Sequence, residues 1–83
     1  MKTQDLIINN IKRGFNGCHL RSVSHVVKRL SIDYGCNIEV VESAENSLKL
    51  AFDVEDAFVV EFVLSTNPIN GLQNWCTDIK IVE

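Results

Sequence analysis

The pattern of apolar and polar residues changes its period once along this chain, at Gly35. Before that glycine, apolar residues recur at steps of three and four, which places them on one face of an α-helix. After it they alternate with polar residues, as in a strand that has one covered face. The sequence therefore predicts helices followed by strands, with Gly35 ending the last helix in a left-handed conformation.

The strongest helical pattern covers residues 20–34. Its apolar face contains Leu20, Val23, Val27, Leu30 and Tyr34. The start of this helix is ambiguous, because Ser22 is a suitable N-cap while the pattern also allows a start near His19. A shorter helix is predicted over residues 4–13, with Thr3 as its N-cap and Gly14 after its end. Its inward-facing residues are expected to be Leu6, Ile7 and Ile11.

Four strands are predicted after Gly35, over residues 36–42, 47–53, 57–65 and 74–82. The third is apolar on both faces, which is typical of a strand with neighbours on each side, and its outward valines indicate a covered or dimerising surface. The longest loop covers residues 65–73 and contains Asn-Pro and Asn-Gly pairs, which favour turns. The other connections are short, which favours an antiparallel meander.

These elements predict an α+β fold of order ααββββ, with two N-terminal helices packed on one face of a four-stranded antiparallel sheet. A chain of 83 residues is expected to form a single domain over 1–83, because each half alone would be too small to bury a core. So small a core is also compatible with a homodimer. The predicted core consists of Ile7, Ile11, Val23, Val27, Leu30, Ile38, Val40, Leu50, Phe52, Phe58, Val60, Phe62 and Ile79.

Membrane and redox signals are weak in this sequence. It has no apolar run of the roughly 18 residues that a membrane span needs, and its start lacks the basic-then-apolar order of a secretory signal. We therefore expect a cytoplasmic protein that does not enter a membrane. Its three cysteines, Cys18, Cys36 and Cys76, cannot all pair within the chain. They are expected to be reduced thiols, at least two of them in the core.

Residues suited to catalysis or metal binding are few. The cysteines and histidines lack the paired spacing of structural zinc sites, and no set of nucleophile, base and orienting group can be located. The acids at 53–56 lack the ligand order of a calcium loop, and the glycines are scattered rather than gathered in a phosphate-binding loop. We therefore predict a protein that is not an enzyme, with no catalytic residue, metal or cofactor.

Charge is distributed unevenly, although the net charge is only −3. Residues 1–35 hold six Lys and Arg against two acids, whereas residues 36–83 hold two against nine. The exposed side of the second helix is therefore predicted to be basic and the turns of the sheet acidic. The candidate partner-binding residues are Arg21, His25, Lys28 and Arg29 on the helix, and Glu45, Asp53, Glu55 and Asp56 in the turns.

The favoured hypothesis is a small non-enzymatic protein-binding module that inhibits or modulates a partner protein through one of these charged faces. The alternative is a nucleic-acid-binding protein that uses helix 20–34 to contact phosphates. Trp75 and Tyr34 are expected to pack in the core, although either aromatic could anchor an interface. Small acidic α+β chains of this kind also occur among accessory proteins of mobile elements, an association that rests on size and composition alone.

Overall fold

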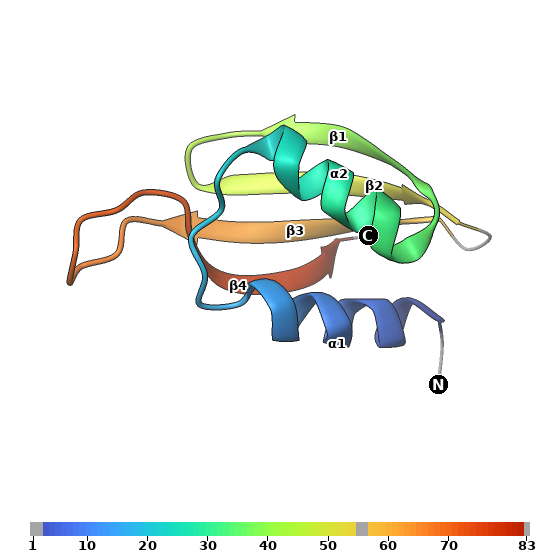
Figure 1. The fold of residues 1–83 in the computed structure, drawn as a ribbon, viewed down its shortest axis with the longest axis horizontal. Coiled ribbons are helices and arrows are strands. Elements are labelled where there is room, and N and C mark those ends of the chain that lie inside the picture. Colours follow the sequence, from blue (N-terminus) through green and yellow to red (C-terminus); the bar gives the residue numbers. More distant parts are fainter. Residues whose placement is uncertain (1–2, 55–56, 83) are drawn as a thin grey trace.

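The computed structural model describes residues 3–54 and 57–82, and within them the chain forms two helices followed by an antiparallel sheet (Figure 1). Each strand pairs with the next, so the sheet has the order β1-β2-β3-β4 of a meander. The predicted α+β class and ααββββ order are confirmed. The elements are α1 (Thr3–Phe15), α2 (Val23–Tyr34), β1 (Asn37–Ser43), β2 (Ser47–Asp53), β3 (Phe58–Ser65) and β4 (Trp75–Val82).

Three of the predicted roles fall outside the described part of the chain. The side chain of Thr3, predicted to cap α1, is one of them. Glu55 and Asp56, predicted as part of the acidic turn, are the other two. Neither helix in the described part is both long and apolar enough to cross a membrane.

Both helices pack on the same face of the sheet, α1 along β4 and α2 along β1 (Figure 1). The sheet residues that face them alternate along β2 and β3, as the period of two predicts. Among the residues whose burial the structure describes, fifteen apolar side chains are buried between the two layers in one cluster. They are Ile7, Ile8, Ile11, Phe15, Val26, Leu30, Leu48, Leu50, Phe52, Phe58, Val60, Phe62, Leu64, Cys76 and Ile79.

The two helices are tied to the centre of the sheet by aromatic contacts. Phe15, at the end of α1, meets Phe62 of β3 edge to face, with 5.8 Å between the ring centroids. Tyr34, at the end of α2, meets Phe52 of β2 in the same way at 6.1 Å, and Phe52 stacks on Phe58 at 5.1 Å. Edge-to-face and stacked pairs at these separations add to the apolar burial of the rings.

The start of α2 and its buried stripe differ from the prediction. The helix begins at Val23, because the Ser22 side chain accepts a hydrogen bond from the His25 amide and caps it. Leu20 therefore precedes the helix. Gly35 ends it in the left-handed conformation, with φ of 59°, as predicted. Val26 and Leu30 are the fully buried residues of α2.

Apolar steps of three and four fit two neighbouring stripes of α2 equally well, and packing over the sheet selects the one through Val26. Val23 and Val27 were both predicted as core residues, but they are only partly buried against the hydrophobic core. The same correction applies to α1, where Ile8 is buried and Leu6 is exposed. The reason is again geometric, because periodicity gives the width of an apolar face but not its centre.

Two β-bulges alter the faces of the edge strands. In β1 the register shifts between Val40 and Glu42, which leaves Val41 as the extra residue. Val40 was predicted to be a core residue and is instead 42% exposed, since it lies on the outermost strand, where only Ile38 is partly buried. In β4 the shift leaves Thr77 as the extra residue.

The bulge at Thr77 changes which residues of β4 face the core. Strict alternation from Trp75 would place Cys76 on the outer face. The extra residue instead lets Cys76 and Ile79, three positions apart, both become fully buried. Prediction by a period of two cannot locate such a bulge.

Candidate interaction surfaces

Three of the four basic residues predicted on the second helix lie together. His25, Lys28 and Arg29 line a shallow open depression on the exposed side of α2, together with Ile32 and Asp33. The fourth, Arg21, is exposed in the connection that precedes the helix. The structure therefore preserves a basic surface, although not one that belongs to a single element.

Arg29 is partly committed to the fold. Its guanidinium lies 5.1 Å from the centroid of the Phe15 ring, a cation–π contact between the two helices. Its Nε also lies 3.8 Å from the Asp33 carboxylate, one helical turn away. In the part of the chain that the structure describes, Lys28 and Arg21 make no ion pair. They therefore carry most of the unpaired positive charge of this basic surface.

The two predicted acidic residues that the structure describes, Glu45 and Asp53, are not brought together. Glu45 lies in the turn between β1 and β2, and Asp53 lies at the opposite end of β2. Seven residues of extended strand separate these ends by about 20 Å. Glu45 instead borders the base of the loop between β3 and β4, where it lines a depression with Thr66 and Gln73.

The loop between β3 and β4, residues 66–74, is hereafter called the projecting loop. It extends past the end of the sheet along the long axis of the molecule (Figure 1). Ile69, near its tip, is 94% exposed, and Leu72 is more than half exposed. Sequence reasoning identified the loop but missed these side chains as functional candidates.

The projecting loop is held by its own hydrogen bonds. The Asn67 side-chain oxygen accepts from the Ile69 amide at 2.9 Å, and the Asn70 side-chain oxygen accepts from the Leu72 amide at 3.0 Å. The backbone amide of Asn67 also donates to the Leu72 carbonyl at 2.9 Å, and the backbone amide of Gly71 donates to the Asn67 carbonyl at 2.8 Å. Gly71 has φ of 72°, which a glycine adopts without strain. These contacts favour one conformation before any partner binds.

His19 fixes the base of the projecting loop. Its Nδ1 lies 3.2 Å from the Gln73 carbonyl, and its Nε2 lies 3.4 Å from the Asn67 side-chain nitrogen. Because the Asn67 oxygen already accepts from Ile69, the Asn67 side-chain nitrogen is the group that faces the ring. The same segment pairs with β4, since the Cys76 amide donates to the Cys18 carbonyl at 2.8 Å.

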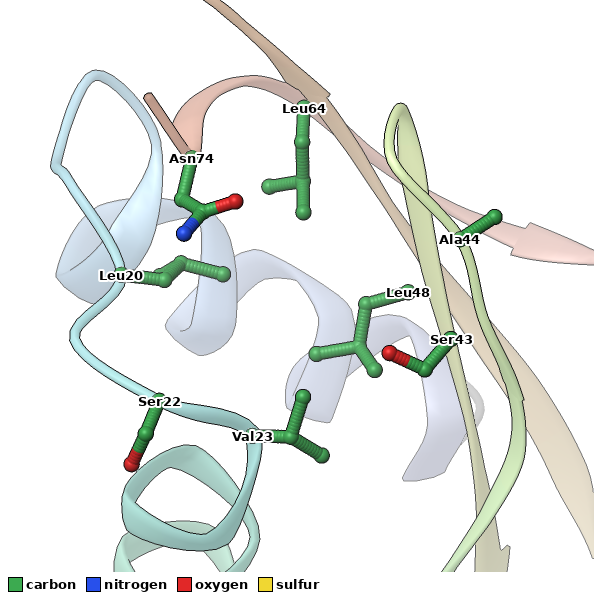
Figure 2. A pocket seen from close by; sticks show the side chains of 8 residues that line it. All are labelled: Leu20, Ser22, Val23, Ser43, Ala44, Leu48, Leu64 and Asn74. Carbon is green, nitrogen blue, oxygen red and sulfur yellow. The ribbon is translucent and has the colours of Figure 1, made fainter. Parts of the chain in front are cut away.

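A small cavity of about 60 Å³ lies near the same end of the molecule. Four apolar side chains point toward one another around it, those of Leu20, Val23, Leu48 and Leu64 (Figure 2). Pockets that enclose organic ligands usually measure about 300 Å³ or more. This cavity is therefore a packing defect rather than a ligand site.

The three cysteines are free and differ in exposure. Cys76 is buried in the core, Cys36 is partly buried against it, and Cys18 is exposed. Cys76 therefore lies in the core and Cys36 only at its edge, so the prediction that at least two cysteines lie in the core is only partly confirmed. Burial raises the pKa of the Cys76 thiol to about 11, so at neutral pH it is not a thiolate nucleophile. The described residues contain no group of three or more His, Cys, Asp or Glu side chains placed to hold a metal ion.

Trp75 and Tyr34 are both partly buried, which leaves little of either ring for an interface. The Trp75 ring nitrogen donates to the Gly17 carbonyl at 3.3 Å and so joins β4 to the connection between the helices. Tyr34 packs on Phe52. Burial and, to a smaller extent, the neighbouring Asp33 raise the pKa of Tyr34, so its hydroxyl stays protonated at neutral pH.

Comparison of the chain with protein-family models, with curated proteins and with solved structures finds no match in any of the three. Evidence on the function of this chain therefore comes from its surfaces. Two of them stand out: the projecting loop, which exposes Ile69 and Leu72 and is internally hydrogen-bonded, and the basic side of α2.

Proposed function

We propose that this chain is a non-enzymatic protein-binding module that inhibits or modulates a partner protein, and that the projecting loop enters the partner. The observation that carries the proposal is the 94% exposure of Ile69 on a loop fixed by its own hydrogen bonds. An exposed isoleucine gains about 1.5 to 3 kcal/mol when it is fully buried. A loop that is already ordered loses little conformational entropy on binding, so most of that gain contributes to affinity.

The surroundings of the loop indicate the chemistry of the partner. An apolar tip on a convex loop fits a concave apolar pocket, which is the arrangement of interface anchors. Glu45 borders the loop base, so the acidic turn predicted from the sequence would lie at the rim of such a contact. We therefore infer a partner whose apolar pocket has a basic rim, where charge complementarity accelerates encounter.

The test uses Ile69→Asp, with Ile32→Asp as the matched control. Ile32 is also strongly exposed, at 71%, but lies on α2 beside the basic residues. Tagged protein is purified from its own host with nuclease treatment, and co-purifying proteins are quantified for both variants. Ile69→Asp should lower the recovery of one stoichiometric partner by about tenfold or more, while Ile32→Asp should retain it.

Two results would contradict the loop proposal. One is a partner that Ile69→Asp retains, whether or not Ile32→Asp loses it. The other is the absence of any stoichiometric protein. Melting curves of both variants must match the wild type, because both positions are exposed.

Nucleic-acid binding is the second candidate, favoured by the clustering of His25, Lys28 and Arg29 on one exposed side of α2. If it is correct, affinity for duplex or single strands should fall steeply with salt. It should fall again in the double variant Arg21→Glu, Lys28→Glu, which removes two cations of this surface that make no ion pair within the described residues. No binding at low salt would exclude this candidate.

A further inference from the structure

The sheet has a second face, opposite the helices, that no element within residues 3–54 and 57–82 covers. This open face consists of the outward residues of all four strands. Those of β2 and β3 are partly buried by their neighbours within the sheet: Ser47, Lys49, Ala51, Val59, Glu61 and Val63. On the two central strands the open face therefore carries the charged residues Lys49 and Glu61 with smaller side chains on either side of them.

The charged row contains one residue from each strand. Strand pairing places Glu42 opposite Lys49, Lys49 opposite Glu61, and Glu61 opposite Lys80. The row therefore alternates in sign across the whole sheet. Two of its neighbouring pairs are ion pairs, with 3.1 Å from Lys49 Nζ to Glu42 and 3.4 Å from Lys80 Nζ to Glu61.

Small side chains lie on both sides of the charged row, and each of these two strips includes one acid on an edge strand. On one side the pairing aligns Glu39, Ala51, Val59 and Val82, and on the other it aligns Ser47, Val63 and Asp78. The small side chains over the central strands let two sheets approach to about 10 Å, the usual distance in sheet-on-sheet packing. The open face thus combines an alternating charged row with strips that are apolar at Ala51, Val59, Val63 and Val82.

We propose that the open face is the interface of a symmetric dimer and that its occupant is a second copy of this chain. A twofold axis parallel to the strands and between β2 and β3 lays β2 of one copy over β3 of the other, and β1 over β4. Lys49 then faces Glu61 of the second copy, and Glu42 faces Lys80. An alternating row of four reversed in this way is its own complement, so each charge meets the opposite sign.

The size of the open face sets the strength of this dimer. Four strands about 4.8 Å apart and about 25 Å long cover roughly 500 Å² per copy, or about 1,000 Å² in total. That is the lower limit of specific interfaces, so association should be weak and dependent on concentration. The side chains of Glu61 and Lys49 are only 17% and 28% exposed, so they have already lost part of their hydration in the monomer. This lowers the desolvation penalty of bringing two charged rows together.

The edge of β1 is the competing surface, because Val40 and Val41 are exposed there. Pairing of β1 with a second β1 would extend the sheet rather than cover its face. The bulge at Val41 interrupts the row of backbone groups that such pairing needs. The open face is therefore the better site for a second copy, and it leaves the projecting loop of each copy accessible.

The test exploits the self-complementarity of the row. The quadruple variant Glu42→Lys, Lys49→Glu, Glu61→Lys, Lys80→Glu inverts the four charges of the row. It keeps the net charge of the chain and both ion pairs within it. It should associate with itself as the wild type does. A mixed dimer of the two chains would place like charges opposite each other at every position. Native mass spectrometry of the mixture should therefore show mixed dimers about tenfold below the statistical half.

A single reversal separates the open face from other surfaces. Lys49→Glu places carboxylates against each other twice in the dimer and should weaken self-association by about tenfold, whereas Arg21→Glu, the same change off the sheet, should not. Sedimentation is measured from about 10 µM to about 1 mM with a reductant, because the exposed Cys18 could form a disulfide between copies. Melting curves establish that each variant is folded.

Four outcomes would overturn the proposal. They are a wild-type chain that stays monomeric at about 1 mM, failure of the folded quadruple variant to associate with itself, mixed dimers at the statistical fraction, and self-association that survives Lys49→Glu. If self-association survives Lys49→Glu but is lost in Val41→Lys, the interface is the β1 edge instead. None of these results depends on the projecting loop, so the two proposals succeed or fail separately.

Discussion

Cys76 is the side chain whose acid–base behaviour is changed most clearly by the fold. It is fully buried, and its Sγ lies 3.6 Å from the Asp78 carbonyl oxygen. Burial raises the pKa of the thiol from 9.0 to about 11. The buried thiol therefore links protonation to stability.

We predict that the free energy of unfolding falls as the pH rises from 9 to about 11. Below pH 9 the thiol is protonated in both states. Above it, the unfolded chain loses the proton while the folded chain retains it up to about pH 11, so the unfolded state binds fewer protons and becomes favoured. The loss from this group should be on the order of 2 kcal/mol, measured by urea unfolding across the window.

The control for this prediction is Cys76→Ala, because Cys36 and Tyr34 also have raised pKa values and contribute in the same direction. The difference between wild type and variant isolates Cys76. Parallel curves for the wild type and Cys76→Ala would show that the Cys76 thiol does not titrate as proposed.

At the scale of the element, α2 is defined by its two caps more than by its apolar pattern. Gly35 could be predicted as the end, because a left-handed residue is needed where the chain leaves the helix for β1. The start could not be decided between His19 and Ser22, since Leu20 and Val23 fit the same periodicity. The structure settles it through one contact, the 3.2 Å hydrogen bond from the His25 amide to the Ser22 oxygen.

We predict that Ser22→Ala destabilises the protein by about 1 kcal/mol, because it leaves the first amides of α2 without their side-chain acceptor. Ser31→Ala is the matched control, since it removes a hydroxyl from a later turn of the same helix and leaves the cap in place. Chemical unfolding followed by circular dichroism measures both. Equal stability of the two variants would mean that the Ser22 contact does not stabilise the helix.

The strand boundaries were predicted to within one residue, but the faces of the edge strands were not. Alternation is a local signal and continues through a bulge unchanged, whereas the bulges at Val41 and Thr77 follow from pairing with a neighbouring strand. The bulge at Val41 also brings Glu42 opposite Lys49. The alternating charged row therefore could not be derived without the register.

Only the turns of the projecting loop could be predicted from the sequence, for a similar reason. Asn, Pro and Gly predicted that residues 65–73 turn, and the side chains of Asn67 and Asn70 accept from backbone amides as such residues do. The exposure of Ile69 depends on how far the loop extends from the core, which no short-range pattern reports. The exposed positions of His25, Lys28 and Arg29 on α2 were predicted correctly because charge on a helix face is a local property, whereas Arg21, also predicted on the helix, precedes it.

At the scale of the whole molecule, the described residues share one hydrophobic cluster to which both helices and the sheet contribute. Phe62 lies at its centre, fully buried in β3 and in contact with Phe15 of α1. Removal of this ring would weaken the contact between the layers rather than one element. Helices and sheet should therefore unfold together.

We predict that Phe62→Ala lowers the free energy of unfolding by about 3 to 5 kcal/mol, the usual result of creating a cavity at a buried phenylalanine. A domain of this size has a total stability of about 5 to 15 kcal/mol, so the variant should be close to unfolding at room temperature. Val63→Ala is the control, because Val63 is the next residue of the same strand but faces the open side of the sheet. It should cost no more than about 1 kcal/mol.

Two probes decide whether the chain behaves as the single domain that its length predicts. Far-UV circular dichroism follows the helices and strands, while the fluorescence of Trp75, the one tryptophan, follows the contact between β4 and the Gly17 carbonyl. With a shared core the two transitions coincide in urea, and both move to lower urea by the same amount in Phe62→Ala. Separate midpoints, or a Phe62→Ala protein with the wild-type curve, would mean that the helices and the sheet do not depend on one core.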